Sequence, residues 1–446
     1  MQSRLCDQLG RHRRAVAAGV ASGAVVLLIV AIGLASGVFG PQPTGETGAT
    51  PTVQPTPSSQ PTDGPSSTPS STPTVASGGP LITWSEQSFE GSVNAISVDS
   101  GQFVAVGKTA AGLAAWTSPD GVTWELHPVP QPRSDQILPN FPGDESSFLS
   151  LLGLGPLARL GDTLYSFGTF GGFIDFIRPL GWRSADGTQW EFIESESEFF
   201  AYGSIRDLAA SDTGLLAARG GGFGQFAGGA WLWTPETSWT ATGLASSPGS
   251  SITILDLAWN DSGFIAVGLS AQGDPSTDSL DWPVSAASWI SIDGKTWQQA
   301  PPSSSLDQAI MWAVSPMPVG GFVAVGCVEC SQGHPGGAGY GDPAAWTSPD
   351  GVNWTQLPLP SGGVGEALGV LPVQNGFLAV GAVGEDTVTW TSSDGSTWRA
   401  GPTLPGRFQP KTLAAKDESV ILTLIRGEGQ GGLPIESVLM LGEIEP

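Results

Sequence analysis

The sequence contains few basic residues, and their shortage excludes two kinds of partner. It has 446 residues with 17 Lys and Arg against 41 Asp and Glu, a formal net charge of −24 at pH 7. From residue 81 onward there are 38 acidic and 13 basic side chains, a net charge of −25. A surface this negative repels nucleic acid and anionic lipid, so neither is expected as a partner of this part of the chain.

Long hydrophobic runs are also scarce, but one stands near the N-terminus. Residues 15–39 form an uncharged stretch of 25 residues, enough to cross the roughly 30 Å bilayer core as a helix. Residues 1–14 carry four arginines, and no Lys or Arg follows until Lys108. The positive-inside rule therefore predicts a single-pass cell-membrane protein with a cytoplasmic N-terminus and an extracytoplasmic remainder. A signal peptide cleaved near Ala35 is the alternative, although its apolar region usually has only about 7–15 residues.

The next segment, residues 40–80, lacks the composition of a folded domain. Between Pro41 and Pro80, 31 of 40 residues are Pro, Thr, Ser or Gly, and only Glu46 and Asp63 are charged. Such a segment cannot bury a core, so it is predicted to be a disordered and partly extended linker.

Cysteine is nearly absent, with three in the chain. Cys6 precedes the predicted membrane helix, whereas Cys327 and Cys330 form a C-x-x-C pair beyond it. Outside the cell such a pair is most simply a disulfide that closes a loop. A redox pair, or a zinc site that includes His334, remains the alternative.

Tryptophan, by contrast, recurs at a fixed spacing. Six times two tryptophans stand eight residues apart, and five of these pairs read W-x-S-x-D-G-x-x-W. The pairs are Trp116/Trp124, Trp182/Trp190, Trp231/Trp239, Trp289/Trp297, Trp346/Trp354 and Trp390/Trp398. Self-similarity of this kind indicates a repeat architecture.

Each repeat contains the signals of four short strands. Glycine-bounded apolar runs beginning at Phe103, Phe264, Phe322 and Phe377 precede four of the pairs, and another short apolar stretch precedes each run. The third strand is predicted to carry the first tryptophan of a pair, and the fourth to begin at the second tryptophan, after a tight turn. Four strands per repeat with variable loops predict an all-β propeller over residues 81–446.

The Ser-x-Asp-Gly-x-Thr-Trp turns resemble the Asp-box of sialidase-like (BNR-repeat) β-propellers. The first copy has Ser118, Asp120, Gly121 and Trp124, and the others have Asp186/Trp190, Asp293/Trp297, Asp350/Trp354 and Asp394/Trp398. Two copies depart from the motif, with Gln189 and Asn353 in place of Thr. Asp and Ser can bind nearby backbone N–H groups, and Gly tolerates the positive φ of a tight turn, so these residues are predicted to be structural.

The resemblance does not extend to a sialidase active site. Phe176-Ile-Arg178-Pro179 has the residues of the family's arginine motif in a different order, and none of the three tyrosines stands in a matching context. We therefore expect Arg178 to be an ordinary loop residue.

The number of blades is predicted to be seven, with six as the alternative. Apolar stretches at 412–415, 419–424 and 437–441 supply three strands of a last blade, but no fourth follows. Residues 82–89 contain a Thr-Trp pair like those that begin the fourth strand elsewhere. An N-terminal strand that completes the last blade would close the ring.

Because the strands of a repeat are antiparallel, the turn between its first and second strands and the turn between its third and fourth strands lie on one face of the ring, the hairpin-turn face. The remaining loops lie on the other face. The long loops of repeats two, four and five should gather on that second face, the inserted-loop face, where binding residues are expected. The candidates are Arg178, Asp274, Asp278, Asp281, Trp282, His334, Tyr340 and Asp342. The loop of Asp274 to Asp281 could hold Ca²⁺ but matches no EF-hand, and a solvated acidic loop without metal or cofactor is favoured.

Together these features predict a membrane-anchored, extracytoplasmic propeller that binds a protein or a glycan, or acts as a scaffold, without catalysis. The alternative is a divergent sialidase-like glycoside hydrolase or lyase, with catalytic carboxyl groups roughly 5–9.5 Å apart. A surface spacer without a specific ligand is the third interpretation.

Overall fold

The structure is a computed structural model of the chain. It describes residues 79–137, 149, 151–170, 178–193, 205–219, 229–234, 237–244, 250–272, 284–330, 341–404, 408–426 and 436–445. All of these belong to one compact unit, Thr74–Pro446. The predicted cytoplasmic segment, membrane helix and nearly all of the linker lie outside the described residues. Within those ranges, no helix is long and apolar enough to span a bilayer.

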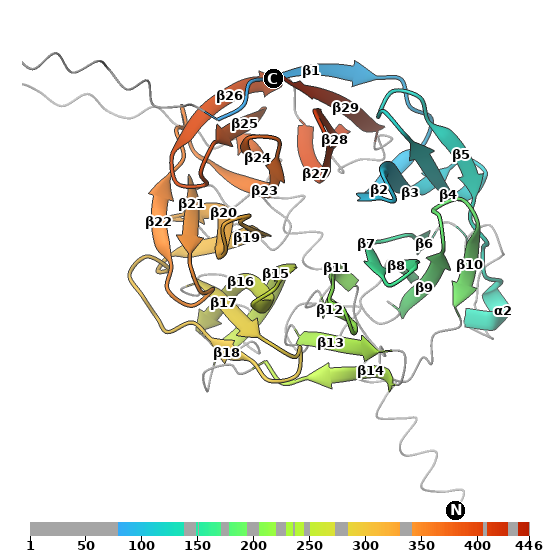
Figure 1. Cartoon of the computed structure of the whole chain (residues 1–446), viewed down its shortest axis with the longest axis horizontal. Helices are drawn as coiled ribbons and strands as arrows, with labels where there is room; N and C mark the ends of the chain where they lie inside the picture. Colours follow the sequence, from blue (N-terminus) through green and yellow to red (C-terminus); the bar gives the residue numbers. More distant parts are fainter. Residues whose placement is uncertain are drawn as a thin grey trace, which may run out of the picture. The chain divides into compact units, whose positions relative to one another are not determined.

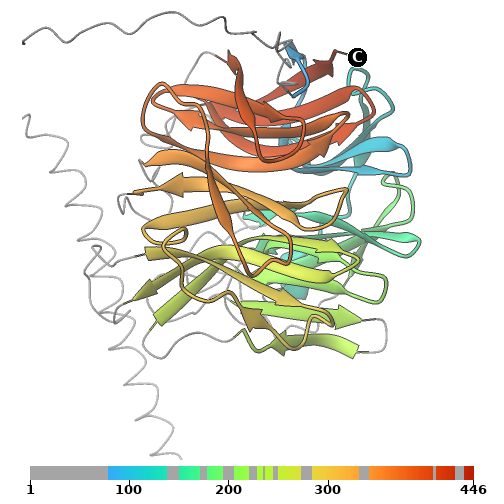
Figure 2. The ribbon, with the colours of Figure 1, turned by 60° about the vertical axis from the view of Figure 1, so that its left-hand side comes forward.

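The described strands form seven antiparallel sheets arranged as blades around a ring (Figure 1, Figure 2). Blade one contains β2 (Ser92–Asp99), β3 (Gln102–Thr109), β4 (Gly112–Ser118) and β5 (Glu125–Pro128). Blade two contains β6 (Leu152–Gly153), β7 (Leu157–Leu160), β8 (Thr163–Phe170), β9 (Arg178–Ser184) and β10 (Trp190–Ile193). Blade three contains β11 (Ile205–Ala210), β12 (Leu215–Arg219), β13 (Gly229–Thr234) and β14 (Thr237–Thr242). A short helix, α2 (Ser134–Ile137), follows β5.

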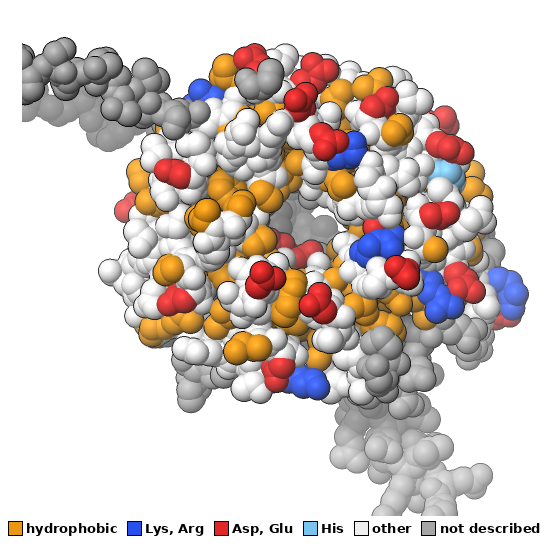
Figure 3. Space-filling view, in the orientation of Figure 1, with side chains coloured by type: hydrophobic (Ala, Val, Ile, Leu, Met, Phe, Trp, Pro, Cys, Tyr) orange, Lys and Arg blue, Asp and Glu red, His pale blue; other side chains and the backbone are white. Residues whose placement is uncertain are grey.

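The remaining four blades keep the same order from the centre outward. Blade four contains β15 (Ser250–Asn260), β16 (Gly263–Gln272), β17 (Val284–Ser291) and β18 (Gln298–Gln299), and blade five contains β19 (Ala309–Pro316), β20 (Phe322–Val328), β21 (Asp342–Ser348) and β22 (Thr355–Pro358). Blade six contains β23 (Gly365–Val373), β24 (Gly376–Val383), β25 (Asp386–Ser392) and β26 (Trp398–Leu404). Blade seven contains β27 (Phe408–Lys416), β28 (Ser419–Arg426), β29 (Glu436–Ile444) and, outermost, β1 (Ile82–Gln87). The space-filling view shows a hollow at the centre of the ring (Figure 3).

The seventh blade joins the two ends of the propeller. β1 pairs with β29 from Ile82↔Ile444 to Gln87↔Leu439. The prediction of seven blades is therefore confirmed, and the alternative of six is wrong.

Tryptophan and small apolar side chains fill the spaces between blades. The first tryptophan of a pair is buried, and Trp182, Trp289, Trp346 and Trp390 are among the largest fully buried side chains. The indole N–H of Trp346 donates to the Ser305 carbonyl at 2.8 Å, and that of Trp390 to the Pro360 carbonyl at 2.7 Å. Each thus ties its blade to the connection that enters it and satisfies its polar atom inside the core.

The second tryptophan closes the Ser-Asp-Gly turn. In blade two, Ser184 Oγ accepts from the Gly187 N–H at 2.9 Å, and Asp186 Oδ1 accepts from the N–H groups of Thr188 and Gln189 at 2.8 and 3.2 Å. Gly187 has φ 81°, a conformation that favours glycine. Trp190 Nε1 donates to the Gly187 carbonyl at 2.8 Å.

In blades four and five the second tryptophan also contacts the preceding blade. Trp297 Nε1 donates to the Gly294 carbonyl of its own turn at 3.2 Å and to Thr242 Oγ1 of β14 at 3.1 Å. Trp354 Nε1 donates to the Gly351 carbonyl at 3.2 Å and to Ser288 Oγ of β17 at 2.8 Å. Both indoles are buried, so each turn is fixed against the neighbouring blade as well as closed on itself.

The predicted start of the fourth strand is wrong in four blades. Strands β5, β18 and β22 begin one residue after the second tryptophan, at Glu125, Gln298 and Thr355. Strand β14 begins at Thr237, two residues before Trp239, because this repeat lacks the Ser-Asp-Gly turn and pairs Thr234 with Thr237. In blades two and six the strand begins at the tryptophan, as predicted.

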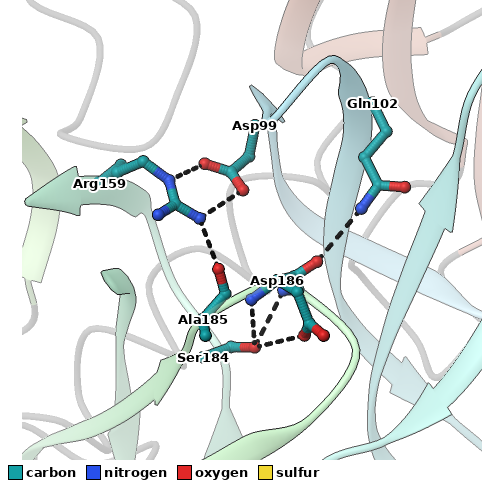
Figure 4. Close-up of polar contacts among 7 residues, drawn as sticks. Asp99, Gln102, Arg159, Ser184, Ala185 and Asp186 are labelled. Atoms are coloured by element: carbon teal, nitrogen blue, oxygen red, sulfur yellow. Dashed lines mark hydrogen bonds and ion pairs between the residues drawn. The ribbon is translucent and has the colours of Figure 1, made fainter. Parts of the chain in front are cut away.

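Contacts between blades one and two place both kinds of hairpin turn on the same face, as the topology requires (Figure 4). Arg159 Nη2 donates to Asp99 Oδ2 at 2.6 Å and to the Ala185 carbonyl at 2.9 Å. Gln102 Nε2 donates to the Asp186 carbonyl at 3.1 Å. Asp99 and Gln102 flank the first hairpin of blade one, whereas Ala185 and Asp186 belong to the second hairpin of blade two.

Replacing Asp186 with Ala should destabilise the propeller by about 1 kcal/mol, because two exposed backbone N–H groups exchange a carboxylate acceptor for water. The Thr188 N–H is the main cause that lowers the pKa of Asp186 to about 2. This stabilisation is therefore present above the ordinary pKa near 4 and is lost as the pH falls toward 2. Denaturant unfolding of the full chain at pH 7 and pH 2.5 measures both effects. The exposed Asp386, replaced with Ala, is the control and should change stability by less than about 0.5 kcal/mol; an equal effect of both variants contradicts the expectation.

Candidate functional site

The innermost strands of six blades share a β-bulge, which leaves one residue of each outside the regular pairing. The pairing with the second strand shifts at this point in every one of these blades. The extra residues are Asn94, Arg206, Leu255, Trp312, Leu368 and Lys411. In blade two the innermost strand is instead divided into β6 and β7.

Contacts between blades indicate that four of these residues, Asn94, Arg206, Trp312 and Lys411, line the central channel. The Arg206 guanidinium of blade three lies 5.9 Å from the centre of the Trp312 ring of blade five, so the contact passes in front of blade four. On the other side, Lys411 Nζ of blade seven donates to Asn94 Oδ1 of blade one at 2.7 Å. Asn94 Nδ2 in turn donates to the Leu154 carbonyl of blade two at 3.0 Å.

The residue after the bulge joins neighbouring blades. Asp207 Oδ2 accepts from the Leu257 N–H at 2.8 Å, and Asp256 Oδ2 accepts from the Val314 N–H at 2.7 Å. Thr412 Oγ1 accepts from the Ile96 N–H at 3.3 Å in the same way. These side chains satisfy backbone donors that the innermost strands leave free on the channel side.

Asp207 and Asp256 also lie close enough to hydrogen-bond to each other. Burial raises the pKa of both carboxyl groups, that of Asp256 well above its usual value, and the two charges repel. Both effects favour the protonated form of the pair. Arg206 lies near both carboxyl groups, and burial against the channel wall lowers the pKa of its guanidinium although the side chain reaches solvent.

Glu366 is the most deeply buried acid of the channel, with 6% of its surface exposed. Burial raises its pKa to about 7, and the nearby Trp312 side chain opposes that shift. The indole N–H and the carboxyl group are thus close enough to interact, but Trp312 Nε1 and Glu366 Oε2 are buried and neither atom forms a well-aligned hydrogen bond. Unpartnered buried polar atoms are rare in native proteins, so each calls for an explanation.

This part of the channel lies toward the inserted-loop face. The Gly365 N–H donates to the Gly341 carbonyl at 2.7 Å, which ties the residue before Glu366 to the segment that enters β21. The sulfur atoms of Cys327 and Cys330 are bonded, with Cα atoms 5.9 Å apart, at the base of the same loop. The Cys330 N–H donates to the Gln308 carbonyl at 3.3 Å, just before β19. The start of the blade-five loop is thus fixed beside the strand that carries Trp312.

The structure tests few of the residues predicted from the sequence. Asp342 is exposed at the start of β21, and Arg178 begins β9 but its side chain is outside the described part. The other candidates, Asp274, Asp278, Asp281, Trp282, His334 and Tyr340, lie outside the described residues. Among the residues described, no group of three or more His, Cys, Asp or Glu could hold a metal ion. The prediction that the loop of Asp274 to Asp281 is a solvated acidic loop and not a Ca²⁺ site stays a prediction, because the loop lies outside this part of the chain.

Sequence reasoning missed the channel residues. Arg206-Asp207, Asp256 and Glu366 place charged residues in strands that are otherwise largely apolar. An alignment of the innermost strands with one another could have found this signal.

The chain has low similarity to several solved structures. No protein-family model and no curated protein matches the chain. YCF48 bound to a D1 peptide is 13% identical, with 82% of this chain and 98% of that chain covered and a TM-score of 0.49. Catalytically inactive virginiamycin B lyase from Staphylococcus aureus with quinupristin is 7% identical, with coverage of 81% and 99% and a TM-score of 0.49. An α-L-arabinofuranosidase from Fusarium graminearum with an iminosugar inhibitor is 12% identical, with coverage of 81% and 97% and a TM-score of 0.41.

The Glu366→Gln variant should change stability in a pH-dependent way. The folded-state pKa of about 7 lies above the ordinary value of 4.5, so wild-type stability falls as the pH rises through this window. At pH 8.5 the variant should be more stable than wild type by up to about 3 kcal/mol, with little gain at pH 5. Denaturant unfolding at both pH values measures the difference. Glu125→Gln, on exposed β5, is the control and should show no such dependence; a pH-independent difference for Glu366→Gln contradicts the burial of its charge.

Proposed function

We propose that the chain is a membrane-anchored, extracytoplasmic propeller of the sialidase-like (BNR-repeat) superfamily that binds a protein or glycan ligand without catalysis. The ligand enters the central channel from the inserted-loop face. The uncharged run at 15–39 and the linker at 40–80 support the anchor, and the five Ser-Asp-Gly turns support the superfamily.

The observation that carries this proposal is the convergence of polar groups on the inner wall of the ring. The Arg206 guanidinium lies over the Trp312 ring, and Trp312 Nε1 and Glu366 Oε2 are buried without a well-aligned hydrogen bond. These groups come from three blades. Concave sites with an aromatic wall and a few convergent polar groups are where proteins most often bind ligands.

Hydrolysis has less support from the described geometry. A glycosidase needs two carboxyl groups roughly 5–9.5 Å apart across a pocket. Asp207 and Asp256 are close enough to hydrogen-bond, and each also accepts a backbone N–H from the next blade. Both carboxyl groups are therefore occupied in holding blades together, and binding is the better-supported function.

Affinity capture with the full chain in detergent micelles tests the binding face. The Trp312→Ala variant should lose the partners that wild type retains from a cell-envelope extract. Val319→Ser, on the hairpin-turn face with 89% of Val319 exposed, is the matched control and should retain them. Loss of partners in Val319→Ser with retention in Trp312→Ala would place the ligand on the wrong face and refute the proposal.

A further inference from the structure

We infer that the channel wall binds an arginine side chain of a partner protein on the face of the Trp312 ring, and that Arg206 occupies this position until the partner arrives. This inference rests on the proposed function and specifies its ligand as a protein that presents a guanidinium group.

The first argument is that a guanidinium group already lies on this ring. Arg206 Cζ is 5.9 Å from the centre of the Trp312 ring, near the limit of about 6 Å for an attractive cation–π contact. The two residues belong to blades three and five, so their contact neither pairs strands within a blade nor joins adjacent blades. Tryptophan is the aromatic side chain that attracts cations most strongly. The ring is therefore a suitable site for a guanidinium group, and Arg206 demonstrates the fit.

The second argument is the charge of the surrounding wall. The innermost strands of blades three to six are β11, β15, β19 and β23. Within these four strands the acidic residues are Asp207, Asp256 and Glu366, and the only basic residue is Arg206. Asp207 and Asp256 attract the Arg206 guanidinium, and Glu366 lies beside the Trp312 indole. An arginine that takes the place of Arg206 on the ring meets the same three carboxyl groups, which would repel an anionic ligand.

The third argument is that Arg206 can be displaced. Arg206 is exposed, and Trp312 is partly exposed. A cation–π contact at an exposed site shifts an equilibrium by only about two- to fivefold. Rotation of the Arg206 side chain into solvent uncovers the ring without any movement of the backbone. The net charge of −24 on the chain also attracts a cationic partner from a distance.

The test uses the pentapeptide Gly-Gly-Arg-Gly-Gly, acetylated and amidated so that the guanidinium is its only charge. Two further peptides carry citrulline, which has the shape of arginine without its charge, or glutamate in its place. Ligand-observed NMR with the full chain in nonionic detergent micelles at low ionic strength measures binding. The arginine peptide should bind with a Kd of about 1 mM, and the other two at least about tenfold more weakly.

Variants of the two contacting residues should act in opposite directions. Arg206→Gln removes the internal competitor, so it should strengthen binding of the arginine peptide about two- to fivefold. Trp312→Leu removes the ring and should weaken binding about tenfold or more. Trp312→Phe should lie between Trp312→Leu and wild type, because phenylalanine attracts cations less strongly than tryptophan.

Two controls separate this site from general effects of charge and packing. Arg183→Gln removes the same charge from blade two, where Arg183 pairs with Glu191, and should leave peptide binding almost unchanged. Trp233→Leu removes a partly buried tryptophan of β13 that packs on Tyr165. It should lower the unfolding midpoint at least as much as Trp312→Leu does, without affecting the peptide.

The inference is overturned if the citrulline peptide binds as well as the arginine peptide, or if Trp312→Leu binds as wild type does. It is also overturned if Arg206→Gln weakens binding or has only the effect of Arg183→Gln. If the capture experiment then still shows that Trp312→Ala loses its partners, the proposed function survives with another class of ligand. If Trp312→Ala retains its partners as well, the proposed function fails together with this inference.

Discussion

Closure of the ring by β1 is the interaction on which the rest of the structure depends. Its six residues pair with β29, so the first and last parts of the propeller sequence form one sheet. Every blade then packs between two neighbours, and no sheet edge is left open between the ends of the ring. The channel exists only because the ring is closed, and its wall includes innermost strands from both ends of the sequence, such as β2 and β27.

Within this ring the β-bulges of the innermost strands serve both assembly and recognition. One residue of each bulge region points into the channel, and the next binds a backbone N–H of the following blade in three cases. Asp207 and Asp256 perform this second role in adjacent blades, which brings their carboxyl groups together. The cost of burying two acids is reduced by the nearby Arg206, which lowers the pKa of Asp207. For Glu366 only the Trp312 side chain opposes the effect of burial, and a buried polar group this poorly satisfied is typical of functional sites.

The repeats in the sequence were sufficient to predict the propeller, the seven blades and the closing strand. These features depend on local patterns, such as the tryptophan spacing and the Ser-Asp-Gly turns, whose geometry is set within a few residues. Even there, the fourth strand was predicted one residue too early at Trp124, Trp297 and Trp354 and two residues too late at Trp239, because the tryptophan spacing does not show how far strand pairing extends into the turn.

The candidate site could not be predicted in this way. Arg206 and Trp312 belong to blades three and five. Their contact depends on the radius of the ring and on which residue of each innermost strand forms the bulge. The inserted loops were predicted to carry the site, but most of their candidate residues lie outside the described part of the chain.

Hydrogen exchange of the β1 amides tests the closed ring most directly. Mass spectrometry of the native full chain would compare Ile82–Gln87 with Trp398–Leu404, the strand β26 at the same outer position in blade six. A closed ring predicts that the backbone N–H groups of β1 that pair with β29 exchange as slowly as those of β26, because both strands open only with their sheets. Exchange of β1 at the rate of unprotected amides, with β26 still protected, would contradict the ring and the channel that it encloses.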